Sequence, residues 1–194
     1  MNLPNRLTVL RLLLIPVFVV LFYLEFPLHY LFSAVVFALA TCTDFLDGYL
    51  ARKNNLVTNL GKFLDPIADK VLVSTAIILL LTVPEFYSAI LPAEIMMPCL
   101  GVCASLILAR ELIVSGFRIV AASAGLVLAA DKLGKWKTVF QDVAILLLLI
   151  SGGVSETLGA VLTYLGLFAL AVATVLTVVS GCHYVISNKE VLKT

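Results

Sequence analysis

Long apolar stretches recur along the whole 194-residue chain, and they constrain its fold more than any other feature. Hydrophobic residues make up 62% of the sequence and the mean hydropathy is +1.12, whereas ordinary soluble domains contain about 45–50% apolar residues. A composition this apolar excludes a soluble globular domain. The charged fraction of only 13% excludes a disordered chain, because disorder requires high charge and low hydrophobicity. The sequence therefore predicts an all-α integral membrane protein.

Six stretches approach the about 20 mostly apolar residues that a helix needs to cross a bilayer. Within a single membrane domain spanning 1–194, we expect transmembrane helices at 12–25, 30–50, 66–83, 93–115, 136–151 and 159–186. Leucines at helical spacing share one stripe ahead of the first span: Leu3, Leu7, Leu10 and Leu14. Residues 2–13 are therefore interpreted as an amphipathic helix lying in the membrane interface. The alternative is that they form the first turns of span one.

Basic residues are confined to one side of this predicted arrangement. Six spans place both termini and the segments 50–65 and 116–137 on the same side, and these regions hold eleven of the thirteen Lys and Arg residues. The opposite connections carry four glutamates and no basic residue: Glu25, Glu85, Glu94 and Glu156. Because positive loops stay inside, both termini and the active site are expected to be cytoplasmic, in a multi-pass protein of the inner membrane. The net charge of +1 argues against a nucleic-acid partner.

Acidic residues gather at the cytoplasmic ends of the second and third spans. Helical spacing places one set on a single face of the second span: Asp44, Asp47, Gly48, Ala51 and Arg52. Gly61, Asp65 and Asp69, each four residues apart, share a face of the next helix. Four carboxylates at one depth would repel each other unless cations neutralise them, and all-oxygen ligands favour Mg²⁺ or Mn²⁺. The pattern therefore predicts a site for two metal ions that clamps a pyrophosphate.

The complete run Asp44-x2-Asp47-Gly48-x2-Ala51-Arg52-x8-Gly61-x3-Asp65-x3-Asp69 resembles the signature of the CDP-alcohol phosphatidyltransferases. All eight fixed positions of that signature are present. The resemblance implies a six-helix homodimer with a polar cavity that faces the cytoplasm. It also implies a reaction in which an alcohol attacks the β-phosphorus of a CDP-linked lipid and CMP leaves.

The resemblance assigns roles to individual residues. It assigns the metal ions to the four aspartates Asp44, Asp47, Asp65 and Asp69, and it makes Asp69 also the base toward the acceptor hydroxyl. It places the CDP-lipid against Asp44, Gly48, Ala51, Arg52, Gly61, Asn5 and Thr8.

Cations elsewhere in the chain bear on the acceptor alcohol. Arg110 and Arg118 are eight residues apart and share a helical side, and Lys135 lies at the start of the fifth span, so the acceptor is expected to carry a phosphate. The alternative is that Arg110 pairs with Glu111 or an aspartate and the other cations anchor helices at lipid headgroups, as we expect for Lys137.

Four sequence strings resemble the branch of the family that joins CDP-diacylglycerol to sn-glycerol 3-phosphate. They are Pro4-Asn5-x2-Thr8-x2-Arg11, the segment 63–70, Ala109-Arg110-Glu111 and Gly134-Lys135-x-Lys137-Thr138. A cardiolipin synthase of the same family, with a lipid acceptor, is one alternative. A cation- or proton-coupled transporter is another, because it would also need intramembrane aspartates.

Two local details stay open in the sequence. Pro66 has no backbone N–H, so either the third helix starts there with Asp65 as its cap, or the helix is kinked in its first turns. Gly159 and Gly166 predict that the last span packs closely against a neighbouring helix or a dimer mate.

Overall fold

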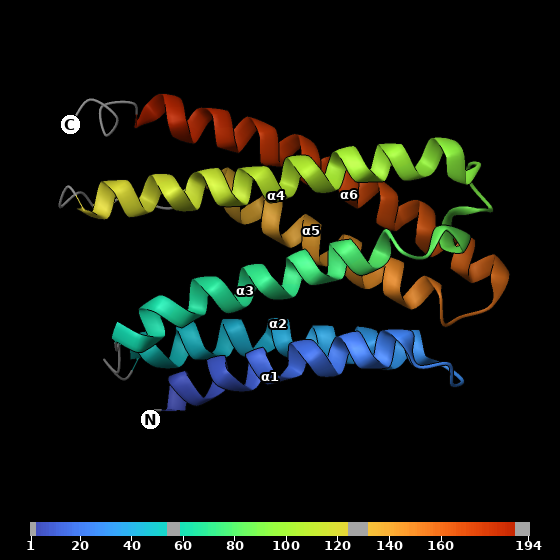
Figure 1. Ribbon diagram of the computed structural model, residues 1–194, viewed down its shortest axis with the longest axis horizontal. Helices are drawn as coiled ribbons and strands as arrows, with labels where there is room; N and C mark the ends of the chain where they lie inside the picture. The colour runs from blue at the N-terminus through green and yellow to red at the C-terminus, as the bar shows by residue number, and fades with distance from the viewer. Residues whose placement is uncertain (1–2, 54–58, 124–131, 189–194) are drawn as a thin grey trace.

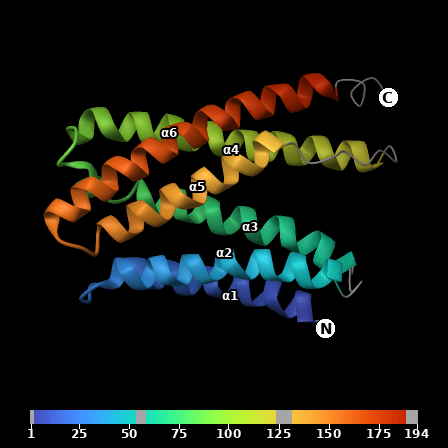
Figure 2. The same cartoon turned by 180° about the vertical axis from the view of Figure 1, so that it is seen from behind.

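The computed structural model describes residues 3–53, 59–123 and 132–188, with side chains except at 3–4, 44–53, 59–60, 62–63 and 132. The described chain forms six long helices and one short 3-10 helix: α1 (Leu3–Tyr23), α2 (His29–Lys53), α3 (Asn59–Leu80), η1 (Pro84–Tyr87), α4 (Ala93–Ser123), α5 (Lys132–Ser151) and α6 (Glu156–Ser187). The long helices run roughly along one axis of an elongated bundle (Figure 1). The start of α1 and the end of α6 lie at the same end, which the reverse view also shows (Figure 2).

The first helix corrects the expected start of the chain. α1 runs without a break from Leu3 through Pro16 to Tyr23, so residues 3–13 are continuous with the first predicted span. This continuity favours the alternative interpretation over a separate interfacial helix at 2–13. These residues are the first turns of the first long helix, because their polar side chains face the protein. Thr8 and Arg11 are fully buried, and the Nε of Arg11 donates to the carbonyl oxygen of Ala40 on α2 at 3.2 Å.

Two prolines lie inside helices. Pro66 is within α3, which begins at Asn59, so Asp65 is an interior helical residue and not a cap. Pro98 is within α4, which extends eight residues beyond the predicted end of the fourth span and ends at Ser123. The first turns of α3, ahead of Pro66, and the last turns of α4 matter for the site, because they carry charged residues past the apolar part of each helix.

The core lies along the contacts between paired helices. α1 packs on α2 through aromatic rings, with the centroids of Phe18 and Phe37 5.9 Å apart. α6 packs on α5, and apart from Leu170 its buried residues are small or hydroxylated: Gly159, Thr163, Gly166, Ala169, Ala173, Thr174, Thr177, Ser180 and Tyr184. The neighbour predicted for Gly159 and Gly166 is therefore a helix of the same chain, α5.

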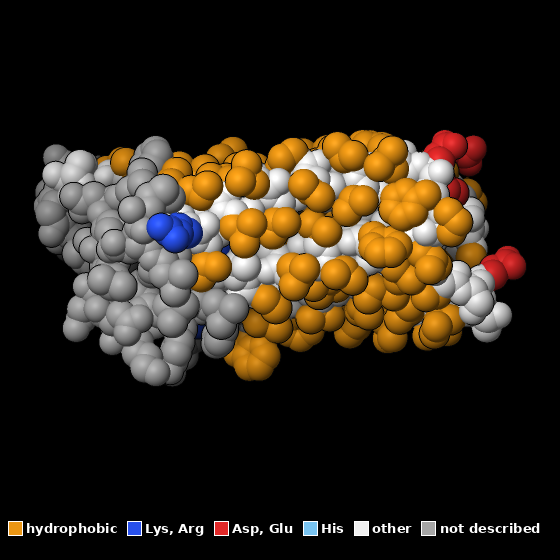
Figure 3. Space-filling view, turned by 90° about the horizontal axis from the view of Figure 1, so that it is seen from below, with side chains coloured by type: hydrophobic (Ala, Val, Ile, Leu, Met, Phe, Trp, Pro, Cys, Tyr) orange, Lys and Arg blue, Asp and Glu red, His pale blue; other side chains and the backbone are white. Residues whose placement is uncertain are grey.

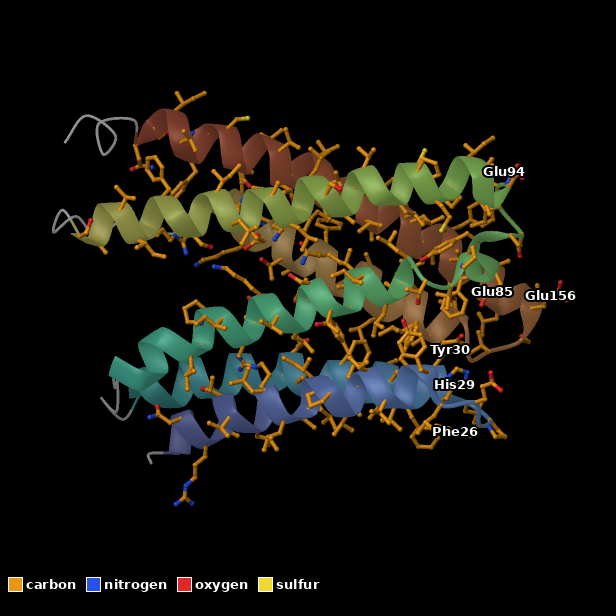
Figure 4. All side chains as sticks on the ribbon, viewed as in Figure 1. Phe26, His29, Tyr30, Glu85, Glu94 and Glu156 are labelled. Atoms are coloured by element: carbon orange, nitrogen blue, oxygen red, sulfur yellow. The ribbon has the colours of Figure 1, made fainter. Side chains whose placement is uncertain are left out.

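Aromatic residues close the end of the bundle that carries the acidic loops. Phe22, Tyr30 and Phe86 pack edge to face, with centroids 5.3 Å and 4.6 Å apart. The hydroxyl of Tyr87 donates to the carbonyl oxygen of Leu80 at 3.0 Å. Burial raises the pKa of Tyr87, so this phenol stays neutral and remains a donor. Figure 4 shows Glu85, Glu94 and Glu156 grouped at this same end.

Apolar side chains cover the middle of the bundle. Figure 3 shows them as a broad orange band, with acidic residues at one end and a basic residue toward the other. Within the described residues, three helices are apolar and long enough to cross a membrane: Asn5–Tyr23 of α1, α4 and α6. α3 and α5 each carry several charged side chains within their length. The protein is thus a helical membrane protein, as its composition predicts.

Candidate active site

A polar cavity of about 340 Å³ opens at the end of the bundle where α1 starts and α6 ends. Four helices line it: α3 with Asp65, Pro66, Asp69 and Lys70, α4 with Arg110, Glu111 and Arg118, α5 with Gly134, Lys135 and Thr138, and α6 with Tyr184. Its volume is at the lower end of the about 300–1,000 Å³ typical of small-molecule sites. Among these lining residues, four are cationic and three are acidic. The cavity therefore suits an anionic ligand, and its carboxylates suit metal cations that bind with that ligand.

The acidic wall of the cavity comes from α3. Asp65 and Asp69 are one helical turn apart and both line the cavity, as their spacing predicts. The hydroxyl of Thr8 on α1 donates to Oδ1 of Asp65 at 2.6 Å, and Thr8 itself is fully buried. Asn5, one turn earlier on α1, is also buried, as is Gly61 on α3. α1 therefore contributes a hydrogen-bond donor to the carboxylate of Asp65.

The remaining members of the predicted donor site have no described side chains. The helix α2 continues through Asp44, Asp47, Gly48, Ala51 and Arg52 to Lys53, but the placement of these five side chains lies outside the described residues. Their predicted roles therefore rest on the sequence pattern alone.

The cationic wall faces the two aspartates. Arg110, Arg118 and Lys135 come from two helices and line the cavity with Asp65 and Asp69. The structure thus brings the three residues predicted to bind the acceptor phosphate together. The alternative interpretation of Arg110 also holds in part, because its Nη1 donates to Oε1 of Glu111 at 3.1 Å. Pairing with Glu111 and a place on the cavity wall are compatible for one guanidinium, since it carries five N–H donors.

An aromatic residue that the sequence did not single out holds Arg118. The Nε of Arg118 donates to the hydroxyl oxygen of Tyr184 at 3.2 Å, and the guanidinium carbon lies 5.5 Å from the centroid of the Tyr184 ring. Tyr184 is buried against Phe117 on α4. The sequence does contain a signal for this residue. Thr177, Ser180 and Tyr184 continue the hydroxyl stripe of α6 at helical spacing toward the site end.

Lys137 differs from its predicted role. It was expected to anchor α5 at lipid headgroups, but its side chain is only 4% exposed and its Nζ lies 2.5 Å from Oε1 of Glu111. The headgroup interpretation fails because Lys137, two residues after the exposed Lys135, lies on a different side of α5 and points into the bundle. Lys70, which no predicted role included, also points inward and donates to the hydroxyl of Ser115.

The donor chemistry of the cavity fits a divalent metal ion in part. Asp65 and Asp69 supply carboxylate oxygens, the ligands that Mg²⁺ and Mn²⁺ prefer. Among the side chains described, no group of three or more potential ligands forms a complete metal site. The other two aspartates of the predicted ligand set, Asp44 and Asp47, lie outside that description.

The fold and this cavity define a class: a helical membrane protein with a charged cavity at one end of its bundle. Carboxylates line one wall of the cavity and cationic side chains line the other. A sequence model described as CDP-alcohol phosphatidyltransferase matches residues 1–185. The chain therefore belongs to the CDP-alcohol phosphatidyltransferase family and is a transferase that acts on phosphate groups. Enzymes of this family generally depend on a divalent metal ion.

Curated relatives support the same family over nearly the whole chain. A protein of Bacillus subtilis is 42% identical over 205 residues, covering 100% of this chain and 98% of the relative. A protein of Rickettsia bellii is 42% identical over 183 residues, covering 94% and 93%. One of Salmonella typhimurium is 39% identical over 185 residues, covering 94% and 92%. All three are named CDP-diacylglycerol–glycerol-3-phosphate 3-phosphatidyltransferase.

Proposed function

We propose that this protein transfers the phosphatidyl group of CDP-diacylglycerol to sn-glycerol 3-phosphate, giving phosphatidylglycerophosphate and CMP. The observation that carries the proposal is the single cavity in which Asp65 and Asp69 face Arg110, Arg118 and Lys135. The names of the relatives that match over the whole chain support the same pair of substrates. Membership of a transferase family sets aside the transporter alternative.

The reaction exchanges the phosphoanhydride bond of the CDP-lipid for a new phosphoester bond. A hydroxyl oxygen of glycerol 3-phosphate forms a bond to the β-phosphorus of the CDP-lipid, and the bond from that phosphorus to the oxygen of CMP breaks. The hydroxyl proton passes to Asp69, which lines the cavity one turn from Asp65. Holding the hydroxyl in line with the leaving oxygen lowers the barrier, because a bimolecular encounter becomes a step within one complex.

The acceptor phosphate binds the three cations of the facing wall. Arg110 and Arg118 present guanidinium donors that suit phosphate oxygens, and the exposed Lys135 supplies a further charge at the cavity mouth. A phosphate held there places the acceptor between the cationic wall and the aspartates. The donor lies on the opposite side, against Asn5, Thr8, Gly61 and the α2 residues Asp44, Gly48, Ala51 and Arg52.

Two Mg²⁺ or Mn²⁺ ions complete the proposed site. Asp65 and Asp69, together with Asp44 and Asp47, would hold them. When bound, such ions neutralise the charge of the diphosphate and stabilise the leaving CMP. The hydroxyl of Thr8 fixes the orientation of the Asp65 carboxylate by occupying Oδ1.

The proposed setting is the inner membrane, with six spans and with both termini and the cavity on the cytoplasmic side. The grouping of Glu85, Glu94 and Glu156 at the end opposite the cavity supports this orientation (Figure 4). We also propose that the protein forms a homodimer, because the family resemblance implies one.

The decisive experiment measures CMP release by detergent-purified protein supplied with CDP-diacylglycerol, Mg²⁺ or Mn²⁺, and a panel of alcohols. Glycerol 3-phosphate should support release, whereas chelation of the metal and Asp69→Asn should abolish it. Phosphatidylglycerol in place of glycerol 3-phosphate tests the cardiolipin synthase alternative. CMP release with a different alcohol but not with glycerol 3-phosphate would change the assigned acceptor. If none of the alcohols supported CMP release, the proposed reaction would be contradicted.

A further inference from the structure

Glu111 connects two cations, of which Arg110 lines the cavity and Lys137 does not. Its Oε1 accepts from Nη1 of Arg110 at 3.1 Å and from Nζ of Lys137 at 2.5 Å. Arg110 is the preceding residue on α4, and Lys137 comes from α5. One carboxylate oxygen therefore holds two helices and two positive charges together.

These three charged groups are largely removed from solvent. The exposed fractions of their side chains are 22% for Glu111, 15% for Arg110 and 4% for Lys137. Removing one partner of such a group leaves an uncompensated charge in a poorly solvated place, which is costly. Surface ion pairs lack this property, because water replaces the lost partner.

The rest of the Arg110 side chain is held from α6. Its Nη2 donates to the hydroxyl of Ser180 at 3.1 Å. A Cβ added at Gly181 would lie 2.9 Å from Cγ of Arg110, so the arginine stem passes directly over this glycine. Glu111 and Ser180 thus hold the two Nη atoms of the guanidinium from two different helices. Without Glu111, a single neutral hydroxyl would hold the charged end of Arg110.

Glu111 also lies at the boundary between two pockets. It lines the main cavity and a smaller pocket of about 30 Å³ beneath it, which Asp69, Lys70, Lys137 and the buried Gln141 share. Lys137 lines only the smaller pocket, whereas Arg110 lines only the main one. The carboxylate therefore retains Lys137 beneath the cavity while Arg110 remains on its wall.

We propose that Glu111 is a positioning residue that sets the affinity for the phosphorylated acceptor by fixing Arg110 on the cavity wall and by neutralising Lys137 beneath it. The inference rests on the proposed function, since it assigns the acceptor phosphate to Arg110. Glu111 itself does not bind the anionic acceptor, because a carboxylate repels a phosphate. Its effect is transmitted through the guanidinium that it orients.

The test compares steady-state kinetics of Glu111→Gln with the unchanged protein, using purified enzyme, CDP-diacylglycerol and glycerol 3-phosphate. We expect the KM for glycerol 3-phosphate to rise about 10-fold, with the KM for CDP-diacylglycerol changed less than 2-fold. Glu156→Gln, an exposed glutamate at the opposite end of the bundle, is the matched control and should leave both constants unchanged.

A double variant separates positioning from folding. Glu111→Gln alone leaves the buried Lys137 without its carboxylate partner, so it should lower the Tm. Adding Lys137→Met removes the buried cation as well, so the Tm should return toward that of the unchanged protein. Arg110 still lacks its carboxylate partner, so the acceptor KM should remain raised. A return of the acceptor KM together with the Tm would show a merely structural role and overturn the inference.

The single variant has further outcomes that contradict the inference. An unchanged or lower acceptor KM, an equal rise for both substrates, or a change confined to kcat would each overturn it. A wild-type enzyme that releases no CMP with glycerol 3-phosphate would instead contradict the proposed function, so the two failures are distinguishable.

Discussion

Tyr184 contacts Arg118 in two ways, and this makes the tyrosine the clearest residue-scale test of the acceptor site. Its hydroxyl oxygen accepts from Nε at 3.2 Å and its ring lies under the guanidinium at 5.5 Å. Tyr184→Phe removes only the first contact. A hydrogen bond to a charged group contributes about 1.5–3 kcal/mol, but Arg118 itself stays in place, so only part of this energy is lost from acceptor binding. The KM for glycerol 3-phosphate should therefore rise about 2- to 10-fold in steady-state assays.

The larger change at the same place is Arg118→Ala. It removes the side chain proposed to bind the acceptor phosphate, so the acceptor KM should rise more than in Tyr184→Phe, by more than about 10-fold. Tyr164→Phe, which alters an exposed tyrosine on the same helix, is the control for both variants. An acceptor KM unchanged in Arg118→Ala would return this arginine to the headgroup-anchor interpretation.

Thr8 links the N-terminal helix to Asp65, a proposed metal ligand. A hydrogen bond to a charged group contributes about 1.5–3 kcal/mol, and the Thr8 hydroxyl is fully buried, so water cannot replace it. Thr8→Val should therefore raise the Mg²⁺ concentration needed for half-maximal activity by about 10-fold, as measured by metal titration of CMP release. Thr8→Ser keeps the hydroxyl and should stay close to wild type.

The control for Thr8 is another buried threonine. Thr163→Val removes a hydroxyl that donates only to the Gly159 carbonyl of its own helix at 2.9 Å. Its metal titration should match that of the unchanged protein. If Thr163→Val and Thr8→Val shift the titration equally, the link from Thr8 to Asp65 has no specific role.

At the scale of helices, the close packing of α6 on α5 depends on glycine. A Cβ added at Gly159 would lie 2.8 Å from the Ser151 carbonyl oxygen, a backbone atom that cannot move without displacing α5. Gly159→Ala should cost about 1–3 kcal/mol and lower the Tm by several degrees in a detergent unfolding assay. Gly101→Ala on α4, where no atom lies within 4 Å of the added Cβ, should leave the Tm unchanged or slightly higher. Equal Tm values for the two variants would contradict this account.

Helical spacing was enough to predict which residues share a face, but not which neighbour a face meets. The spacing of Asp65 and Asp69, and of Arg110 and Arg118, correctly placed each pair on one side of a helix, and the structure brings both sides to one cavity. Lys137 was misassigned because lysines two residues apart on a helix point in different directions, and only the position of Glu111 on α4 shows which one is buried.

Helix boundaries were predicted less well for a related reason. Apolar composition marks where a helix contacts lipid, whereas α1, α3 and α4 all continue into segments whose polar side chains contact other helices. Pro66 does not end α3, since the helix extends on both sides of it from Asn59 to Leu80. The burial of Thr8 and Arg11 likewise depends on contacts with α3 and α2 that hydrophobic periodicity does not contain.

The whole molecule separates charge along its length, and this separation predicts its orientation in the membrane. The cavity end carries the cations Arg110, Arg118 and Lys135, whereas the opposite end carries Glu85, Glu94 and Glu156. Basic segments remain on the cytoplasmic side because their translocation is disfavoured. A cytoplasmic cavity would also give direct access to a water-soluble acceptor and a release path for CMP.

Single-cysteine labelling tests this orientation. In a background whose four free cysteines are replaced, Glu156→Cys places a thiol at the exposed start of α6, and Arg6→Cys places one on the exposed side of α1 near its start. A membrane-impermeant maleimide added to intact spheroplasts should label Glu156→Cys at once. It should label Arg6→Cys only after the membrane is permeabilised. The cysteine-free background must retain CMP release, which shows that the fold is kept. The reverse labelling pattern would place the cavity outside the cell and would contradict the positive-inside assignment.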